Sequence, residues 1–282
     1  MKWLVLLLWS FAGASHAVLR EEVTQIPVEV MDRAGRVVSH EITVTIFRDD
    51  TRPKSAFLIL NHGRAGDAQR RVNLGRSRYA DNAAYFVGQG FAVFVPTRIG
   101  YGVTGGPDVE DGGLCNARDF PSGFAAAAAQ SLAVITYAKA QSYVDATAGV
   151  LAGQSYGGAT TVALAGKNIE GVRAAINFAG GSGGNPTGRP ENPCSPQLLE
   201  KTYADYGRSA RTPMLWLYSE NDKYWGRSYP RQWFEGFIRA GGIGEFVQLP
   251  ASGRDGHSSF TANPVAWKPH VERFLQSNGF LR

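Results

Sequence analysis

The segment that decides the fold reads Gly149-Val150-Leu151-Ala152-Gly153-Gln154-Ser155-Tyr156-Gly157-Gly158. Its first four residues predict a buried strand, and residues 157–165 predict a helix. Glycines two residues before and two residues after Ser155 leave room for the strand and the helix to approach each other around a strained turn. The start of the helix directs backbone N–H groups towards an anion formed beside the serine. Ser155 is therefore a candidate nucleophile; the alternative interpretation of the glycine spacing is an ordinary glycine-rich turn.

Strand and helix patterns alternate on both sides of this segment. Residues 23–47 predict a β-hairpin, because apolar residues alternate on either side of a turn-forming run at 32–35. Short apolar runs predict buried strands at 56–60, 92–95, 149–152, 174–178, 214–218 and 246–249. Helices are predicted at 77–88, 124–140, 157–165, 196–206, 229–240 and 267–276. The alternation predicts an α/β fold with an eight-stranded, mostly parallel sheet and helices on both faces.

With this segment and this alternation, the sequence resembles the α/β-hydrolase superfamily, in which a G-x-S-x-G motif joins a strand to a helix. Within the superfamily it is similar to the dienelactone-hydrolase and prolyl-oligopeptidase-like branch. The resemblance extends over nearly the whole chain after the N-terminal segment, although its motifs are specific to the superfamily and only suggest the branch. Dienelactone hydrolases of the founding kind use a cysteine nucleophile. Because this sequence has Ser155 there, lactone specificity does not carry over.

The superfamily order of catalytic residues places an acid and then a histidine after the serine, at the ends of strands. His257 is the one of the five histidines that combines this order with a position in a loop after a strand. Its imidazole, with an ordinary pKa of about 6.5, is suited to accept the serine proton near neutral pH. Asp222 is the expected acid, with Glu220 in the same loop as the alternative. Asp255 is too close to His257 in sequence to orient its ring.

An acyl-transfer serine also needs hydrogen-bond donors for the developing oxyanion. One is expected to be the backbone N–H of Tyr156. The segment 61–66, Asn-His-Gly-Arg-Ala-Gly, resembles the oxyanion loop of the superfamily and indicates the backbone N–H of Arg64 as the second. Residues expected to line the substrate pocket are Arg98, Tyr101, Tyr224 and Trp225. The side chains of Arg64 and Arg98 are candidates for contact with an anionic substrate group.

The N-terminus predicts export. Lys2 precedes an apolar run at 3–9, and small residues follow at 12–17, as in a signal peptide cleaved after Ala17. A retained membrane anchor is the alternative, but this run is shorter than the roughly 20 apolar residues of a spanning helix. Residues 18–282 then form a single predicted domain. Two cysteines, Cys115 and Cys194, lie in loop-like stretches, and an even count in an exported chain predicts a disulfide between them.

The other features exclude several function classes. The net charge of +5 comes from scattered arginines, which does not indicate a nucleic-acid partner. No GxxxxGK[ST] motif and no suitably placed GxGxxG motif occurs, so no nucleotide cofactor is expected, and the cysteine spacing does not predict a metal site. The leading hypothesis is a hydrolase of small carboxylic esters, without a stable membrane anchor. A small serine peptidase, an acyltransferase and a non-catalytic binding protein of the same fold remain as alternatives.

Overall fold

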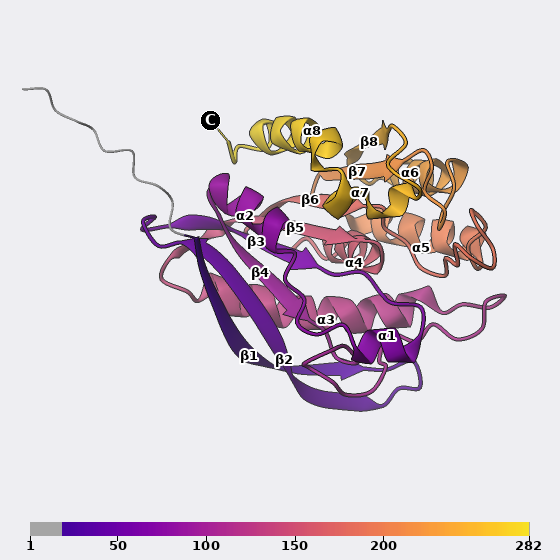
Figure 1. The fold of residues 1–282 in the computed structure, drawn as a ribbon, viewed down its shortest axis with the longest axis horizontal. Helices are drawn as coiled ribbons and strands as arrows, with labels where there is room; N and C mark the ends of the chain where they lie inside the picture. Colours follow the sequence, from indigo (N-terminus) through magenta and orange to yellow (C-terminus); the bar gives the residue numbers. More distant parts are fainter. Residues whose placement is uncertain (1–18, 282) are drawn as a thin grey trace, which may run out of the picture.

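The eight predicted strands form one sheet in the computed structural model, which describes residues 19–281 (Figure 1). The predicted signal peptide lies outside the described residues. The order across the sheet is β1-β2-β4-β3-β5-β6-β7-β8; β1, β2 and β4 pair antiparallel and all other pairs are parallel. The strands are β1 (Leu19–Met31), β2 (Val37–Asp49), β3 (Ser55–Asn61), β4 (Phe91–Thr97), β5 (Val144–Gln154), β6 (Val172–Phe178), β7 (Met214–Ser219) and β8 (Gly244–Leu249). The predicted strand number and the mostly parallel sheet are confirmed.

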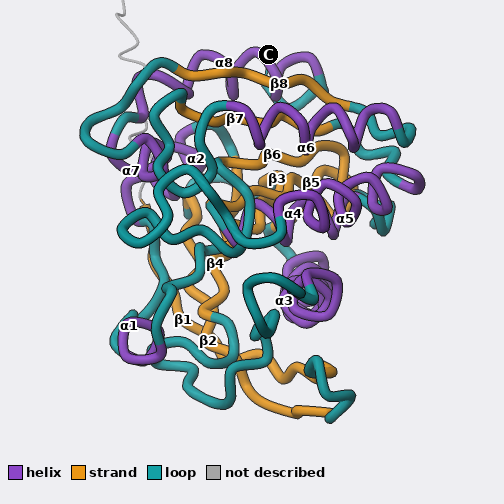
Figure 2. Tube along the Cα trace, turned by 90° about the vertical axis from the view of Figure 1, so that its right-hand side faces the viewer, coloured by secondary structure: helices purple, strands orange, loops and turns teal. Residues whose placement is uncertain are grey.

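Helices cover both faces of this sheet, as predicted (Figure 2). The helices are α1 (Ala68–Val72), α2 (Ala80–Gly88), α3 (Phe120–Lys139), α4 (Tyr156–Ala165), α5 (Pro196–Ser209), α6 (Ser228–Arg239), α7 (Ser259–Ala262) and α8 (Pro264–Ser277), with a 3-10 turn at Gly256–Ser258. Alternate residues of β3 face opposite layers: Phe57 and Ile59 pack with α3 to α6, whereas Leu58 and Leu60 pack with α2, α7 and α8. This period of two is what a strand buried on both faces requires.

Local sequence explains where the long helix α3 begins. The carboxylate of Asp119 accepts a hydrogen bond from the Ser122 backbone N–H at 3.1 Å, and Pro121 occupies the first turn, where its missing N–H is not needed. The sequence pattern placed this start four residues too late, at 124. It also missed α1, α7 and the 3-10 turn, because segments of three to five residues are too short to show a helical period.

Strand register brings the loops that follow β3, β5, β7 and β8 to one edge of the sheet. Asn61 at the end of β3 pairs with Gly153 of β5, and Ser219 at the end of β7 pairs with Leu249 of β8. In parallel sheets this carboxyl edge is where ligands bind. The loops that contain Arg64, Ser155, Asp222 and His257 therefore meet at the same edge.

Candidate active site

Ser155 lies in the turn between β5 and α4 with its backbone in an unusual conformation. Its φ of 56° and ψ of −120° are rare for a residue with a side chain. The flanking glycines explain why the turn is possible: a Cβ on Gly153 would lie 2.2 Å from the Gly157 carbonyl oxygen, and one on Gly157 would lie 2.1 Å from the Asn61 carbonyl oxygen. The strained turn therefore requires glycine at both positions.

A line of hydrogen bonds connects Ser155 to a buried carboxylate. The distance from Ser155 Oγ to His257 Nε2 is 2.9 Å, and the distance from His257 Nδ1 to Asp222 Oδ2 is also 2.9 Å. The other carboxylate oxygen of Asp222 accepts hydrogen bonds from the backbone N–H groups of Tyr224 and Trp225 at 2.8 and 3.2 Å. Glu220, the alternative acid, is exposed on the same loop. The structure thus brings together Ser155, His257 and Asp222.

Three further contacts hold the His257 ring in place. The carboxylate of Asp255 accepts hydrogen bonds from the backbone N–H groups of His257 and Lys223, both at 3.0 Å, and so joins the two loops. The Gln154 side chain donates a hydrogen bond to the His257 carbonyl oxygen at 3.1 Å. The Tyr224 ring stacks on the imidazole with 3.9 Å between ring centroids. Sequence reasoning missed Asp255 and Gln154 as positioning residues, although an Asp two residues before the histidine is a familiar turn signal.

The loop after β3 passes directly beside Ser155. A Cβ on Gly63 would lie 3.2 Å from Ser155 Cβ, which places the following residue, Arg64, next to the nucleophile. Within residues 19–281, neither the Arg64 nor the Tyr156 backbone N–H donates a hydrogen bond to another protein group. Free N–H groups beside a serine hydroxyl are what an oxyanion-binding site requires.

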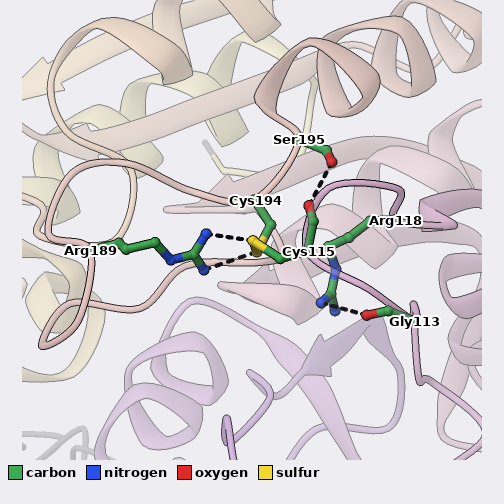
Figure 3. The surroundings of a disulfide bond; sticks show 6 residues. All are labelled: Gly113, Cys115, Arg118, Arg189, Cys194 and Ser195. Atoms are coloured by element: carbon green, nitrogen blue, oxygen red, sulfur yellow. Dashed lines mark hydrogen bonds between the residues drawn. A yellow bond between two sulfur atoms is a disulfide. The ribbon is translucent and has the colours of Figure 1, made fainter.

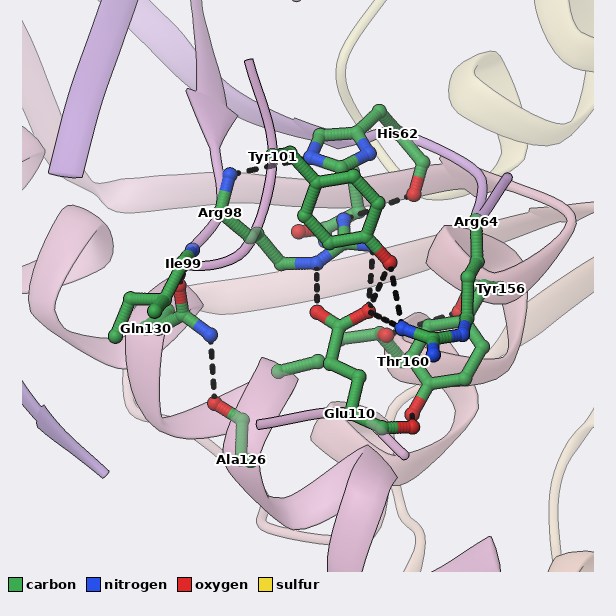
Figure 4. Close-up of polar contacts among 12 residues, drawn as sticks. His62, Arg64, Arg98, Ile99, Tyr101, Glu110, Ala126, Gln130, Tyr156 and Thr160 are labelled. Carbon is green, nitrogen blue, oxygen red and sulfur yellow. Dashed lines mark hydrogen bonds and ion pairs between the residues drawn. The ribbon is translucent and has the colours of Figure 1, made fainter. Parts of the chain in front are cut away.

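A buried charged network holds this loop in place (Figure 4). Arg98 forms an ion pair with Glu110, and both side chains are completely buried. Arg98 also donates from Nη1 to the His62 carbonyl oxygen at 2.8 Å and from its backbone N–H to His62 Nε2 at 3.1 Å. Because Nε2 accepts this hydrogen bond, His62 carries its proton on Nδ1 and donates it to the Gly63 carbonyl oxygen at 2.7 Å.

Burial, together with the positive charge of Arg98, holds the pKa of His62 well below its ordinary value. His62 is therefore neutral near neutral pH, which its role as both acceptor and donor requires. Tyr101 donates to the carboxylate of Glu110 at 2.6 Å, and burial followed by the charge of Glu110 raises the pKa of its phenol. These groups satisfy one another and fix the backbone of residues 62–64.

This network corrects two sequence predictions. Arg98 and Tyr101 were expected in the substrate pocket, but Arg98 is 0% exposed and Tyr101 is 1% exposed, and neither lines the cavity beside Ser155 in the described chain. The physical reason is Glu110, which supplies a buried partner for both side chains. An anion contact by the Arg98 side chain is therefore excluded in this structure. The Arg64 side chain lines the cavity, but its guanidinium is held by both oxygens of Asp108, at 2.6 and 2.7 Å.

The cavity that contains Ser155 has a volume of about 610 Å³. Tyr224 and Trp225 line it, as the sequence predicted, beside Ser155 and Tyr156. Its walls also include the segments 66–71 and 181–187 in part, and five arginines, which are Arg64, Arg70, Arg71, Arg118 and Arg189. The sequence prediction missed Arg118 and Arg189. Their signal was their closeness in sequence to Cys115 and Cys194, whose pairing brings them together.

The predicted disulfide between Cys115 and Cys194 is present (Figure 3). It joins residues 79 positions apart, from the loop before α3 and the loop before α5. Arg189 donates hydrogen bonds to both sulfur atoms, and Ser195 donates to the Cys115 carbonyl oxygen at 2.7 Å. The bond therefore fixes two loops that form walls of the cavity.

Residues 19–281 contain no cluster of three or more histidine, cysteine, aspartate or glutamate side chains arranged to bind a metal ion. Over the same residues, no helix has both the length and the apolar character needed to cross a membrane.

Many solved structures have a similar fold. The sequence itself matches no protein-family model and no curated protein significantly. A protein from Klebsiella pneumoniae assigned as a dienelactone hydrolase has a TM-score of 0.59 and 15% identity, over 91% of this chain and 98% of that chain. An acetyl xylan esterase from Paenibacillus has a TM-score of 0.59 and 14% identity, over 92% and 89%. The acylaminoacyl peptidase of Pyrococcus horikoshii has a TM-score of 0.57 and 11% identity, over 91% of this chain but 41% of that chain. Strand order, the strained serine turn and these similarities together identify this chain as a protein of the α/β-hydrolase fold.

Proposed function

We propose that this protein is a serine hydrolase that cleaves carboxylic esters through an acyl-enzyme on Ser155. The observation that carries the proposal is the unbroken line from Ser155 Oγ through His257 to Asp222, with both hydrogen bonds at 2.9 Å. A hydroxyl, an imidazole and a buried carboxylate in this order can transfer a proton away from the nucleophile as it attacks. The esterases among the structural neighbours support the same class of reaction.

In the proposed first step, Ser155 Oγ attacks the ester carbonyl carbon while His257 Nε2 takes the hydroxyl proton. Asp222 accepts the hydrogen bond from Nδ1–H and stabilises the imidazolium that forms. The backbone N–H groups of Tyr156 and Arg64 would then bind the oxyanion of the tetrahedral intermediate. When the intermediate collapses, the carbon–oxygen bond to the alcohol breaks, and His257 returns the proton to the leaving oxygen. The acyl group remains bonded to Ser155.

In the second step, a water molecule takes the place of the alcohol. His257 removes a proton from the water as its oxygen attacks the acyl carbon, and the same two N–H groups would bind the second oxyanion. Collapse breaks the bond to Ser155 Oγ, and His257 returns the proton to the serine. The products are a carboxylic acid and a free enzyme in its starting protonation state.

An ester rather than a peptide substrate is favoured by what surrounds Ser155. The walls of the cavity come from short loops, including parts of 105–122 and 180–211. Short walls offer few contacts to a long peptide, so little binding energy from remote parts of the substrate is available to assist cleavage of an amide.

The test compares small activated esters of short acyl chains with proline-containing peptide amides on one preparation. We expect a much higher kcat/KM for the esters, with Ser155→Ala as the blank for both. A peptide amide cleaved as efficiently as the best ester would replace the esterase proposal with a peptidase.

We further propose that the protein is exported, with residues 1–17 as a cleaved signal peptide. The disulfide Cys115–Cys194 supports this proposal, because disulfides persist in oxidising compartments. The test is the N-terminal sequence of the protein recovered from the cell exterior or periplasm. An uncleaved N-terminus on protein found in the cytoplasm would contradict it.

A further inference from the structure

The charges that line the cavity beside Ser155 do not balance. Five arginines and three aspartates contribute to its walls. Asp108 pairs with Arg64 and Arg71 at 2.6 and 2.9 Å, and Asp67 pairs with Arg70 at 3.2 Å. The third aspartate, Asp111, faces Arg33 at 3.5 Å. Within residues 19–281, Arg118 and Arg189 therefore line the cavity without a carboxylate within 4 Å.

Arg118 is partly buried, although no carboxylate of residues 19–281 forms an ion pair with it. Its Nη1 donates to the Gly113 carbonyl oxygen at 3.2 Å, and its Nε is buried without a hydrogen-bond partner in the described chain. Burial, and then the nearby charge of Arg64, lowers the pKa of Arg118, which indicates that its positive charge is poorly compensated. A buried charge without a partner costs stability, so its presence in a cavity wall suggests that a ligand supplies the missing charge.

Arg189 lies on the opposite side of the disulfide from Arg118 (Figure 3). Its two Nη groups contact the sulfur atoms of Cys115 and Cys194, which are weak acceptors and carry no charge. Cys115 is three residues before Arg118 and Cys194 is five residues after Arg189. The disulfide therefore joins the two loops that contribute these uncompensated guanidinium groups to the wall of the cavity beside Ser155.

We propose that Arg118 and Arg189 form an anion subsite, and that the preferred substrates are esters which also contain a carboxylate. This inference rests on the proposed ester hydrolysis and names the substrate class. A planar carboxylate matches the donor geometry of guanidinium groups. Two guanidinium groups, one of them already engaged with sulfur, suit a single negative charge better than a polyanion. The carboxylate can belong to the acyl part or to the alcohol part of the ester.

The experiment uses two matched pairs of esters. In the first pair, the para-nitrophenyl monoester of adipic acid is compared with the same ester whose free acid is capped as a methyl ester. In the second pair, para-carboxyphenyl butyrate is compared with its methyl-capped counterpart. We expect the charged member of one pair to be hydrolysed with a kcat/KM about tenfold or more above the neutral member. The pair that shows the preference identifies the part of the ester that lies against Arg118.

Variants then locate the preference. Arg118→Gln is expected to lower kcat/KM for the charged ester by about tenfold to a hundredfold, the range for loss of a charge-assisted hydrogen bond, with little change for the neutral ester. Arg118→Lys retains the charge and should keep part of the preference. Arg173→Gln removes an exposed arginine at the start of β6, the opposite end of the sheet, and should leave both rates unchanged. Equal rates for both members of each pair, or equal losses in Arg118→Gln, would overturn the proposal.

A binding measurement separates this inference from the proposed function. Calorimetric titration of the Ser155→Ala protein with monomethyl adipate should detect binding that Arg118→Gln in the same background weakens by about tenfold or more. If neither ester pair is hydrolysed but this binding is found, ester hydrolysis is wrong and the anion subsite stands. If neutral esters are hydrolysed but no Arg118-dependent binding or preference is found, the anion subsite is wrong and ester hydrolysis stands.

Discussion

Two charged clusters adjoin the loop 62–64, and they differ in where their hydrogen bonds lead. In the first cluster, hydrogen bonds lead from the fully buried carboxylate of Asp222 through His257 to the hydroxyl of Ser155 in the cavity. In the second cluster, Arg98 and Glu110 are equally buried, but their hydrogen bonds lead to each other, to Tyr101 and to the backbone of His62, and none leads to the Ser155 hydroxyl. A buried carboxylate that reaches the nucleophile through an imidazole can assist proton transfer, whereas a buried carboxylate paired with a guanidinium holds the chain in place. Burial and charge alone therefore do not identify a catalytic residue.

Replacing the acid of the first cluster should have the largest effect among the positioning changes. Asp222→Asn keeps the shape of the side chain but removes the charge that stabilises the imidazolium. We expect kcat for an ester to fall by about 10⁴-fold with little loss of stability, as in serine proteases with the equivalent change. Steady-state kinetics and thermal unfolding measure the two effects. Glu220→Gln, an exposed carboxylate in the same loop, is the matched control; a larger kcat loss there would exchange the roles of the two acids.

Replacing the carboxylate of the second cluster should lower the stability of the protein more than its turnover. Glu110→Gln leaves the Arg98 guanidinium buried without a negative partner, which destabilises a protein by about 3–5 kcal/mol. We expect the free energy of unfolding in denaturant to fall by this amount, and kcat to fall less than in Asp222→Asn. The kcat loss reflects only looser positioning of residues 62–64.

A surface ion pair provides the control for this measurement. Glu235 lies 3.8 Å from Arg239 and is half exposed, so Glu235→Gln should change the free energy of unfolding by about 1 kcal/mol or less. If Glu110→Gln cost no more than Glu235→Gln, the buried pair would not hold the loop as described.

The same cluster predicts a smaller, pH-dependent effect. The pKa of His62 lies well below its ordinary value of 6.5 in the folded protein, so below pH 6.5 the unfolded chain takes up a proton that the folded protein does not. Stability from His62 is therefore fully present above pH 6.5 and is lost as pH falls, by up to about 1.4 kcal/mol per pH unit. The variant His62→Gln, which retains a donor and an acceptor, should show a shallower decrease of unfolding free energy between pH 7 and 5. Identical slopes in both proteins would contradict a neutral, buried His62.

The sheet and the turn around Ser155 could be predicted from the sequence, because both depend on patterns within short stretches of residues. The glycines at 153 and 157 mark a turn in which a side chain at either position would clash with the backbone. The alternation of strand and helix patterns along the chain predicts the sheet. Sequence reasoning failed for Arg98, which follows a buried strand and was expected to line the substrate pocket. Its partner Glu110 lies twelve residues further on, in a loop without periodicity, and no sequence pattern predicts that contact. Arg118 and Arg189 were missed for a related reason. Whether an arginine has a carboxylate partner depends on which residues lie near it in the folded protein, and the sequence does not show this.

The central claim, that Ser155 is the nucleophile of an acyl-transfer enzyme, is tested most directly by covalent labelling. The purified protein is treated with a fluorophosphonate, digested and analysed by mass spectrometry, in parallel with ester turnover by wild type and Ser155→Ala. We predict a single adduct on Ser155 in wild type, no adduct in Ser155→Ala, and a loss of turnover in that variant of several orders of magnitude, with the fold intact. An adduct on another residue, or undiminished turnover by Ser155→Ala, would contradict the account.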